Sequence, residues 1–136
     1  MTSDEQFLAE TEKTCFDYVK EESLDKLKDF LKKLDNRTDI YKESLNQKDD
    51  EKMTLLMWAC DRGSYEIVKF LVDSGADINL QDVDGQSCLH YAVSCEHVDI
   101  IKFLLQNKNM NRDLEDSDGV VALDSTDNKE IKDLFV

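Results

Sequence analysis

The sequence predicts an all-α solenoid, in which helix–turn–helix repeats stack side by side and are joined by β-turn fingers. The segment Thr54–Gly63 is repeated as Ser87–Glu96, at an offset of 33 residues. An apolar run follows each copy at the same offset, at Ile67–Val72 and Ile100–Leu105. A fixed period of this length is typical of a solenoid, because each repeat buries its apolar face only against its neighbours.

The first 48 residues contain a weaker version of the helix pair. Residues 1–11 have no periodic pattern and are expected to form a flexible N-terminus. The pattern predicts a first helix at Cys15–Val19 and a second helix with apolar side chains at helical spacing from Leu24 to Leu34. We expect 12–48 to be an atypical N-terminal capping repeat, in which Asp35–Ser44 is a long connection to the next repeat.

Two complete repeats and one shortened repeat follow. They are predicted at 49–81, at 82–115 and at 116–136, the last being a truncated C-terminal capping repeat. Thr54 and Ser87 each precede a short apolar helix and are predicted N-caps, because their hydroxyl oxygens can accept a backbone N–H. Asp-Gly turns at Gly85 and Gly119 predict the fingers between repeats.

The repeats resemble those of ankyrin proteins, which have a period of about 33 residues and a Thr-Pro-Leu-His-x-Ala core. Leu55 and Cys88 stand where that core has proline. Over about residues 12 to 136, the amino-acid sequence also resembles the C-terminal ankyrin tail of acyl-CoA-binding domain-containing proteins. The segments that carry this second resemblance are Phe16-Asp17-Tyr18, Trp58-Ala59-Cys60-Asp61-Arg62-Gly63, Gly75-Ala76-Asp77-Ile78-Asn79, Gln81-Asp82, Gly85-Gln86, Leu89-His90-Tyr91-Ala92 and Ser94-Cys95-Glu96.

The second resemblance implies a tie to fatty-acyl-CoA metabolism and to protein N-myristoylation. In that family the ankyrin tail is the part expected to contact other proteins. The family's helical acyl-CoA-binding bundle has no matching residues in this sequence, since residues 1–11 are too few for a four-helix core. Acyl-CoA is therefore expected as a ligand only if a missing domain supplies its site.

The charge of the chain limits the kinds of partner. Its 31 acidic and 17 basic side chains give a net charge of −14. This disfavours nucleic acid and anionic membranes, and it favours a protein partner with a basic or mixed surface; the alternative is that the charge only keeps a small elongated domain soluble. No apolar run approaches the roughly 18 residues of a membrane span. The absence of a leader-like start predicts a cytoplasmic protein, with the nucleus as the alternative.

The cysteines and histidines do not form a pattern typical of a reactive or metal site. Reduced thiols are expected for all four cysteines. His90 and His97 occupy ankyrin framework positions, and we expect them to hydrogen-bond the backbone. A metal site made of these histidines with Cys88 and Cys95 is the alternative, but no pair has zinc-finger spacing. The acidic turns do not fit an EF-hand loop, and no nucleophile elbow or P-loop is present. We therefore expect no metal, no cofactor and no enzymatic activity.

The candidate partner-binding residues are those that the ankyrin frame leaves variable and points inward. Trp, Tyr and Arg are enriched in binding hot spots, so Trp58, Arg62 and Tyr91 are the predicted centre. The alternative is that Trp58 and Tyr91 only pack between neighbouring helices. The full predicted set is Trp58, Asp61, Arg62, Tyr91, Ser94 and Cys95 on the first-helix face, with Asp50, Glu51, Met53, Val83, Asp84 and Gln86 on the fingers.

Two functions are consistent with these features. The favoured one is a non-enzymatic protein–protein interaction module tied to fatty-acyl-CoA metabolism or protein N-myristoylation. The alternative is a fatty-acyl-CoA-binding protein in its own right. The sequence disfavours the alternative, because coenzyme A carries several phosphates and an acidic face repels them.

Overall fold

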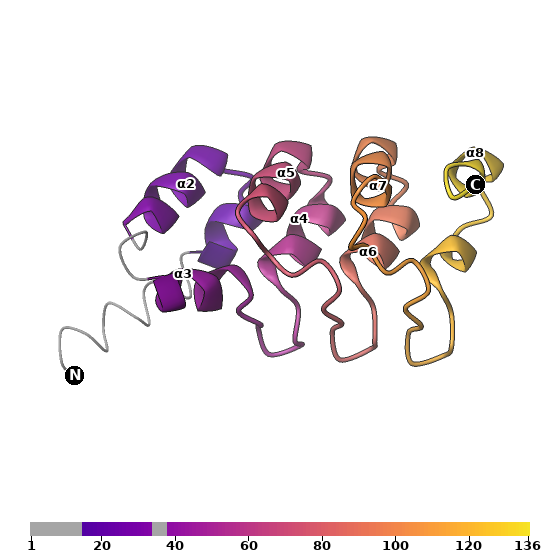
Figure 1. Cartoon of the computed structure of the whole chain (residues 1–136), viewed down its shortest axis with the longest axis horizontal. Coiled ribbons are helices and arrows are strands. Elements are labelled where there is room, and N and C mark those ends of the chain that lie inside the picture. The colour runs from indigo at the N-terminus through magenta and orange to yellow at the C-terminus, as the bar shows by residue number, and fades with distance from the viewer. Residues whose placement is uncertain (1–14, 34–37) are drawn as a thin grey trace.

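The computed structural model describes residues 15–33 and 38–136, and it confirms the all-α solenoid (Figure 1). Its only β-type pairings among these residues are two isolated bridges, Lys48 with Thr54 and Glu115 with Val121. The predicted flexible N-terminus, residues 1–11, and Leu34 lie outside the described residues. The elements are a helical stretch over 15–20, then α2 (Leu24–Lys32), α3 (Thr38–Leu45), α4 (Leu55–Arg62), α5 (Tyr65–Asp73), α6 (Cys88–Ser94), α7 (Val98–Leu105), η1 (Ala122–Ser125) and α8 (Lys129–Asp133).

The helices form two rows and the connecting loops form a third layer (Figure 1). The outer row contains α2, α5, α7 and α8, and the inner row contains α4, α6 and the short η1. Three hairpin-like fingers project from the side opposite the outer row, before α4, α6 and η1. None of the described helices has the length and apolar character needed to cross a membrane.

The predicted N-caps of the two inner helices are confirmed. The Thr54 hydroxyl accepts a hydrogen bond from the backbone N–H of Met57 at 3.2 Å, and the Ser87 hydroxyl accepts one from His90 at 3.4 Å. Helix α4 ends at Gly63, which has a φ of 75°. A Cβ at Gly63 would lie 2.6 Å from the His97 ring, so both the backbone conformation and the space favour glycine there.

The stretch expected as a long connection contains an additional helix, α3. Its physical cause is an amphipathic pattern in which Ile40, Tyr41 and Leu45 recur on one side at helical spacing. Leu45 is fully buried, and Ile40 and Tyr41 pack partly against the core. Residues 40–45 therefore contribute to the core by burial rather than serving only as a linker.

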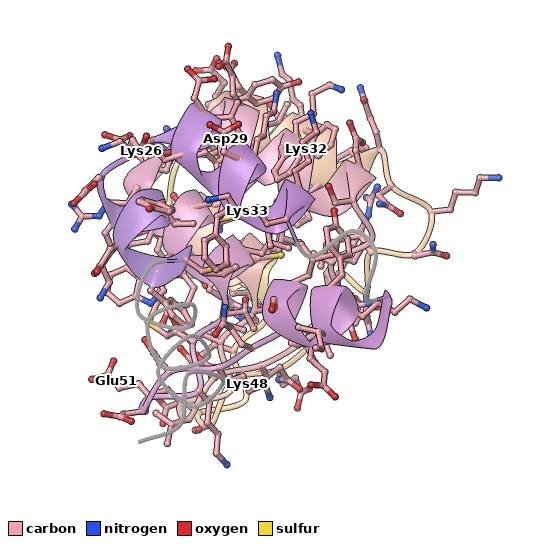
Figure 2. The ribbon with its side chains drawn as sticks, turned by 90° about the vertical axis from the view of Figure 1, so that its left-hand side faces the viewer. Lys26, Asp29, Lys32, Lys33, Lys48 and Glu51 are labelled. Atoms are coloured by element: carbon pink, nitrogen blue, oxygen red, sulfur yellow. The ribbon has the colours of Figure 1, made fainter. Side chains whose placement is uncertain are left out.

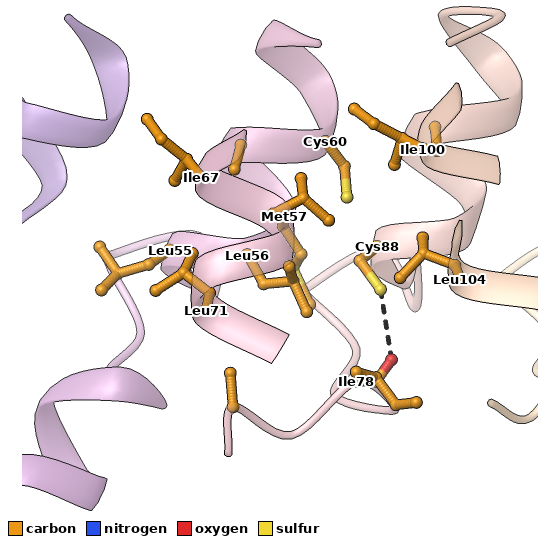
Figure 3. Packing of buried hydrophobic residues seen from close by; sticks show 14 of the residues in the cluster. Leu55, Leu56, Met57, Cys60, Ile67, Leu71, Ile78, Cys88, Ile100 and Leu104 are labelled. Atoms are coloured by element: carbon orange, nitrogen blue, oxygen red, sulfur yellow. Dashed lines mark hydrogen bonds between the residues drawn. The ribbon is translucent and has the colours of Figure 1, made fainter. Parts of the chain in front are cut away.

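The core runs continuously through the stack, between the inner and outer rows (Figure 3). Leu55 and Leu56 of α4 and Leu71 of α5 are almost wholly inaccessible to water. Cys60 of α4 and Cys88 of α6 lie in the same interior region, and the Cys88 thiol donates to the Ile78 carbonyl at 3.3 Å (Figure 3). Burial raises the pKa of Cys60 well above its usual range, so this thiol behaves as a small apolar group.

Candidate functional site

Each finger is shaped by one aspartate whose side chain binds the backbone of its own turn. These three aspartates are Asp49, Asp82 and Asp116. In each case one carboxylate oxygen accepts two backbone N–H groups, from the second and fourth residues that follow, at 2.9–3.0 Å. The N–H of Val120 is the main cause that holds the pKa of Asp116 below its usual value. The turns are thus fixed by local side-chain to backbone bonds.

Neighbouring fingers are also joined by main-chain hydrogen bonds. The Val83 N–H donates to the Glu51 carbonyl at 3.0 Å, and the Ser117 N–H donates to the Asp84 carbonyl at 2.8 Å. Gly85 allows this close approach, because a Cβ there would lie 2.9 Å from the Asp116 Cα. The three fingers consequently form a row with a fixed spacing.

Trp58 and Tyr91 connect the inner helices to the fingers. The Trp58 indole N–H donates to the second oxygen of Asp49 at 2.9 Å, and the Tyr91 hydroxyl donates to the second oxygen of Asp82. Burial, followed by this hydrogen bond, raises the pKa of Tyr91 far above its usual value. Both rings are half-buried, so only part of each ring can meet a partner.

Lys20, which the sequence did not indicate, covers part of the Trp58 ring. Its ammonium nitrogen lies 4.5 Å from the ring centroid, within the range of a cation–π contact. Lys20 belongs to the helical stretch over 15–20, and no sequence spacing relates it to Trp58. The predicted centre of the site therefore includes a cation from the capping repeat.

The remaining inner-helix candidates lie beside one another at the helix ends. Asp61 is half-buried, whereas Arg62, Ser94 and Cys95 are exposed. The Cys95 thiol donates to the Asp61 carboxylate at 3.7 Å. Partial burial and the charge of Asp61 raise the pKa of Cys95. No carboxylate of the described residues lies within ion-pair distance of Arg62.

The finger candidates divide into exposed and buried positions. Asp50, Glu51 and Asp84 are exposed, and Val83 presents an apolar side chain that is 58% exposed. Met53 is only 6% exposed, because it returns from the turn into the core beside the Lys48–Thr54 bridge, so little of it can contact a partner. Gln86 is half-buried, and its backbone N–H is used by Asp82.

Lys52 is a second residue that sequence reasoning missed. It has a φ of 61° at a position that matches Gly85, which lies 33 residues later, and Gly119, which lies a further 34 residues on. A left-handed conformation at a residue with a Cβ is strained. The repeat offset was the signal that could have identified Lys52 as part of the first fingertip.

Charge is distributed unevenly along the stack. Residues 15–48 carry eight acidic and eight basic side chains, whereas 49–136 carry 19 acidic and 8 basic ones. Viewed from its N-terminal end, the molecule presents Lys26, Asp29 and Lys32 on α2, Lys33 just after this helix and Lys48 nearer the fingers (Figure 2). The acidic part of the surface is therefore the part built by the later repeats.

Both histidines bind the backbone, as predicted. His90 accepts the Ser87 N–H at its Nδ1 (3.1 Å), so its protonated Nε2 donates to the Val120 carbonyl at 2.9 Å in the next repeat. The Nε2 of His97 lies 3.3 Å from the Asp61 carbonyl. Within 15–33 and 38–136, no group of three or more His, Cys, Asp or Glu side chains is arranged to hold a metal ion.

Comparison with known proteins identifies the repeats. The family model described as "Ankyrin repeats (3 copies)" matches residues 18–118. An E3 ubiquitin-protein ligase, hecd-1, of Caenorhabditis elegans is 42% identical over 80 residues, which are 59% of this chain and 3% of the relative. An ankyrin repeat-containing protein of Schizosaccharomyces pombe is 30% identical over 94 residues, 65% of this chain and 44% of the relative. Acyl-CoA-binding domain-containing protein 6 of Bos taurus is 39% identical over 68 residues, 50% of this chain and 22% of the relative.

These relatives share repeats rather than a common activity. The chain spans less than half of the length of the curated relatives that it matches. The bovine acyl-CoA-binding domain-containing protein is one of several partial relatives. The comparisons therefore support the resemblance to ankyrin repeats in general, rather than a particular resemblance to that protein.

Proposed function

The chain belongs to the ankyrin-repeat family, and we propose that it is a protein-binding module whose partner contacts the fingertips and the exposed ends of the inner helices. Ankyrin repeats act as protein–protein interaction modules and are typically non-catalytic. The observation that carries the proposal is the row of fingers, in which exposed carboxylates and the exposed Val83 are held at fixed spacing by main-chain hydrogen bonds.

The proposed centre of this interface is Arg62, flanked by the rings of Trp58 and Tyr91. Arg62 is exposed and available for a partner's carboxylate or carbonyl. The polar atoms of Trp58 and Tyr91 already bind Asp49 and Asp82, so these rings would contribute contact area rather than new hydrogen bonds. Ser94, Cys95 and Asp61 border the centre, and Asp50, Glu51 and Asp84 form its acidic rim.

The acidic rim supports a partner with a basic or mixed surface, because complementary potentials steer encounter. A cytoplasmic setting, with the nucleus as the alternative, fits such a module. The finer proposal is that the partner belongs to fatty-acyl-CoA metabolism or protein N-myristoylation. The bovine relative supports this tie, while the ubiquitin ligase shows that similar repeats also occur in other settings.

A fatty-acyl-CoA-binding role is the second candidate, and the name of the bovine relative is the observation that favours it. We expect this chain alone not to bind long-chain acyl-CoA, because a net charge of −14 repels the phosphates of coenzyme A. Isothermal titration with palmitoyl-CoA below its micelle threshold tests this. Saturable binding at one site with a micromolar Kd would replace the first proposal with the second.

The interface proposal is tested with Arg62→Ala and a matched control, Lys108→Ala, which removes an exposed cation from a loop outside the site. Cross-linking to cell lysate, read by quantitative mass spectrometry, identifies proteins that wild type and Lys108→Ala retain and Arg62→Ala loses. The recovered protein is then titrated. Its affinity for Arg62→Ala should fall by about 2 kcal/mol if Arg62 is a hot spot, while the thermal melt stays within about 0.5 kcal/mol of wild type.

Charge reversal of the rim provides an independent test. Asp50→Lys with Asp84→Lys should slow association and flatten its dependence on salt, because rim charges steer encounter more than they hold the complex. A partner whose cross-links fall on α5 and α7 and whose affinity for Arg62→Ala is normal would show that the interface lies elsewhere.

A further inference from the structure

Tyr65 is the centre of a second surface, on the outer row of helices. It occupies the first turn of α5, and it is 38% exposed although its side chain is large and mostly apolar. Its ring and that of Phe103 in α7 form a T-shaped pair, with 5.8 Å between ring centroids and 74° between planes. This contact orients the ring, and part of Tyr65 stays accessible to solvent.

A hollow lies on each side of Tyr65. One, of about 310 Å³, lies toward the next repeat and contains Glu96 and Asp99. The other, of about 210 Å³, lies toward the preceding repeat and contains Glu22 and Glu66. Each of these two hollows thus combines Tyr65 with two acidic residues, and neither is lined by a Lys or Arg side chain. A third hollow beside Tyr65, of about 250 Å³, is lined by Asp99 and Lys102.

Two of these carboxylates are hydrogen-bonded to the following repeat, Glu22 to a residue that lines its hollow and Glu96 to a residue outside its hollow. Glu22 accepts a hydrogen bond from the Ser64 hydroxyl at 2.8 Å, and Glu96 accepts one from the Thr126 hydroxyl at 3.3 Å. Each bond uses only part of the acceptor capacity of a carboxylate. Glu66 and Asp99 have a simpler explanation, since acidic side chains stabilise the first turn of a helix. That explanation does not apply to Glu22 and Glu96, which lie in the loops before α2 and α7.

We propose that these two hollows and Tyr65, together called the Tyr65 surface, bind a peptide segment of another protein with the pattern Arg-x-x-Arg. Arginine fits better than lysine, because its planar guanidinium stacks on an aromatic ring and pairs with a carboxylate through two hydrogen bonds. One arginine occupies each hollow, and the two residues between them pass over the Tyr65 ring.

The spacing of the two arginines follows from the repeat geometry. The hollows are one repeat apart, and packed helices are spaced by about 8–10 Å. A polyproline II segment rises about 3.1 Å per residue with three residues per turn, so side chains three apart lie on one face about 9 Å from each other. A β-strand places alternate side chains on one face, only about 6.8 Å apart. An extended polyproline II segment therefore matches both hollows.

This surface is separate from the interface proposed above. The fingers project from the side of the molecule opposite the outer helices (Figure 1). The exposed carboxylates of the fingertips are those of Asp50, Glu51 and Asp84. A basic peptide that only follows the charge of the chain would bind both places, whereas the proposed segment prefers the Tyr65 surface.

The test is a titration of the ¹⁵N-labelled chain with three synthetic peptides at physiological salt. They contain Arg-Pro-Pro-Arg, Arg-Pro-Arg and Lys-Pro-Pro-Lys, each between glycine spacers, so that all carry two basic side chains. Arg-Pro-Pro-Arg should shift the amides of Tyr65 and His97 and bind at least about fivefold more tightly than the other two, because a stacked cation at an exposed site contributes that order of affinity. Equal affinity for all three peptides, or shifts concentrated on the fingertips, would overturn the proposal.

Variants separate the ring from the charge. Tyr65→Phe should retain binding, and Tyr65→Ala should lose at least about fivefold in affinity, since the ring face rather than the hydroxyl makes the contact. Glu96→Gln should also weaken binding, whereas its charge-matched control Glu51→Gln on a fingertip should not. If Tyr65→Ala melts below the assay temperature, Glu22→Gln with Glu96→Gln replaces it as the decisive variant. Arg62→Ala should leave peptide affinity unchanged, so this test and that of the inner interface can fail separately.

Discussion

Replacing Lys52 with glycine is expected to stabilise the protein. Lys52 has a φ of 61°, while glycine occupies the matching position in the other fingers, with φ of 76° and 78°. The left-handed conformation costs a residue with a Cβ about 1–2 kcal/mol. Glycine adopts it without that strain but loses about 0.4–1 kcal/mol more in backbone entropy on folding. The net expectation is a gain of about 0.5–1 kcal/mol in the free energy of unfolding.

The measurement is urea denaturation followed by circular dichroism, with a thermal melt beside it. For a chain of this size the gain corresponds to a rise in Tm of about 2–4 °C. Lys52→Ala is the matched control, because it removes the same charge and keeps the Cβ and its strain. If the glycine and alanine variants are equally stable, the strain argument is wrong and the effect of Lys52 is electrostatic.

Four further predictions concern stability and accessibility. Asp82→Ala should lower the free energy of unfolding, measured by urea denaturation, by about 2–3 kcal/mol, because two N–H groups and the Tyr91 hydroxyl lose their acceptor. Tyr91→Phe should lower it by about 1 kcal/mol. The raised pKa of Tyr91 favours the neutral phenol in the fold, so its contribution to stability is complete below its ordinary pKa of 10.0 and declines as pH rises above it. Cys95 should be the first cysteine to react with iodoacetamide, because it is exposed while Cys15, Cys60 and Cys88 are buried. Because the pKa of Cys95 is raised, its reaction should accelerate as pH rises beyond the ordinary thiol pKa of 9.0. Arg112→Lys should accelerate hydrogen exchange in α8, since Arg112 bonds the carbonyls of both Phe135 and Leu105.

Each of these predictions has an outcome that would contradict it. If Asp82→Ala is as stable as Tyr91→Phe, the turn holds its shape without the aspartate. If the wild-type chain and Tyr91→Phe lose stability in parallel above pH 10, ionisation of Tyr91 is not the cause of that loss. Rapid labelling of Cys60 in the native state would show that the core opens easily. Unchanged exchange in Arg112→Lys would mean that other contacts hold α8.

The sequence predicted the repeats because their signals are local and periodic. Thr54 and Ser87 are followed by apolar helices at one offset, and each hydroxyl does cap its helix. The additional helix α3 was not predicted, because no comparable pattern recurs later in the chain. Burial of Met53 was missed for a different reason, since it depends on how the chain returns from the turn rather than on the residue's place in the repeat.

The site was less predictable than the fold, because its geometry depends on contacts between elements. Asp49 and Asp82 lie nine residues before Trp58 and Tyr91, so the two pairs share one spacing that is visible in the sequence. That spacing did not reveal that each pair is hydrogen-bonded and that each aspartate already holds its turn. The cation–π contact of Lys20 has no sequence signal at all, because it joins the capping repeat to α4.

The main-chain hydrogen bonds between fingers bear on how such a surface can evolve. Their donors and acceptors are peptide groups of Glu51, Val83, Asp84 and Ser117, and the side chains of these residues take no part in them. Mutation can therefore alter charge and shape at each tip while the distance from tip to tip stays constant. A lineage could exchange one binding partner for another through substitutions at these tips, without a compensating change in the helices that support them.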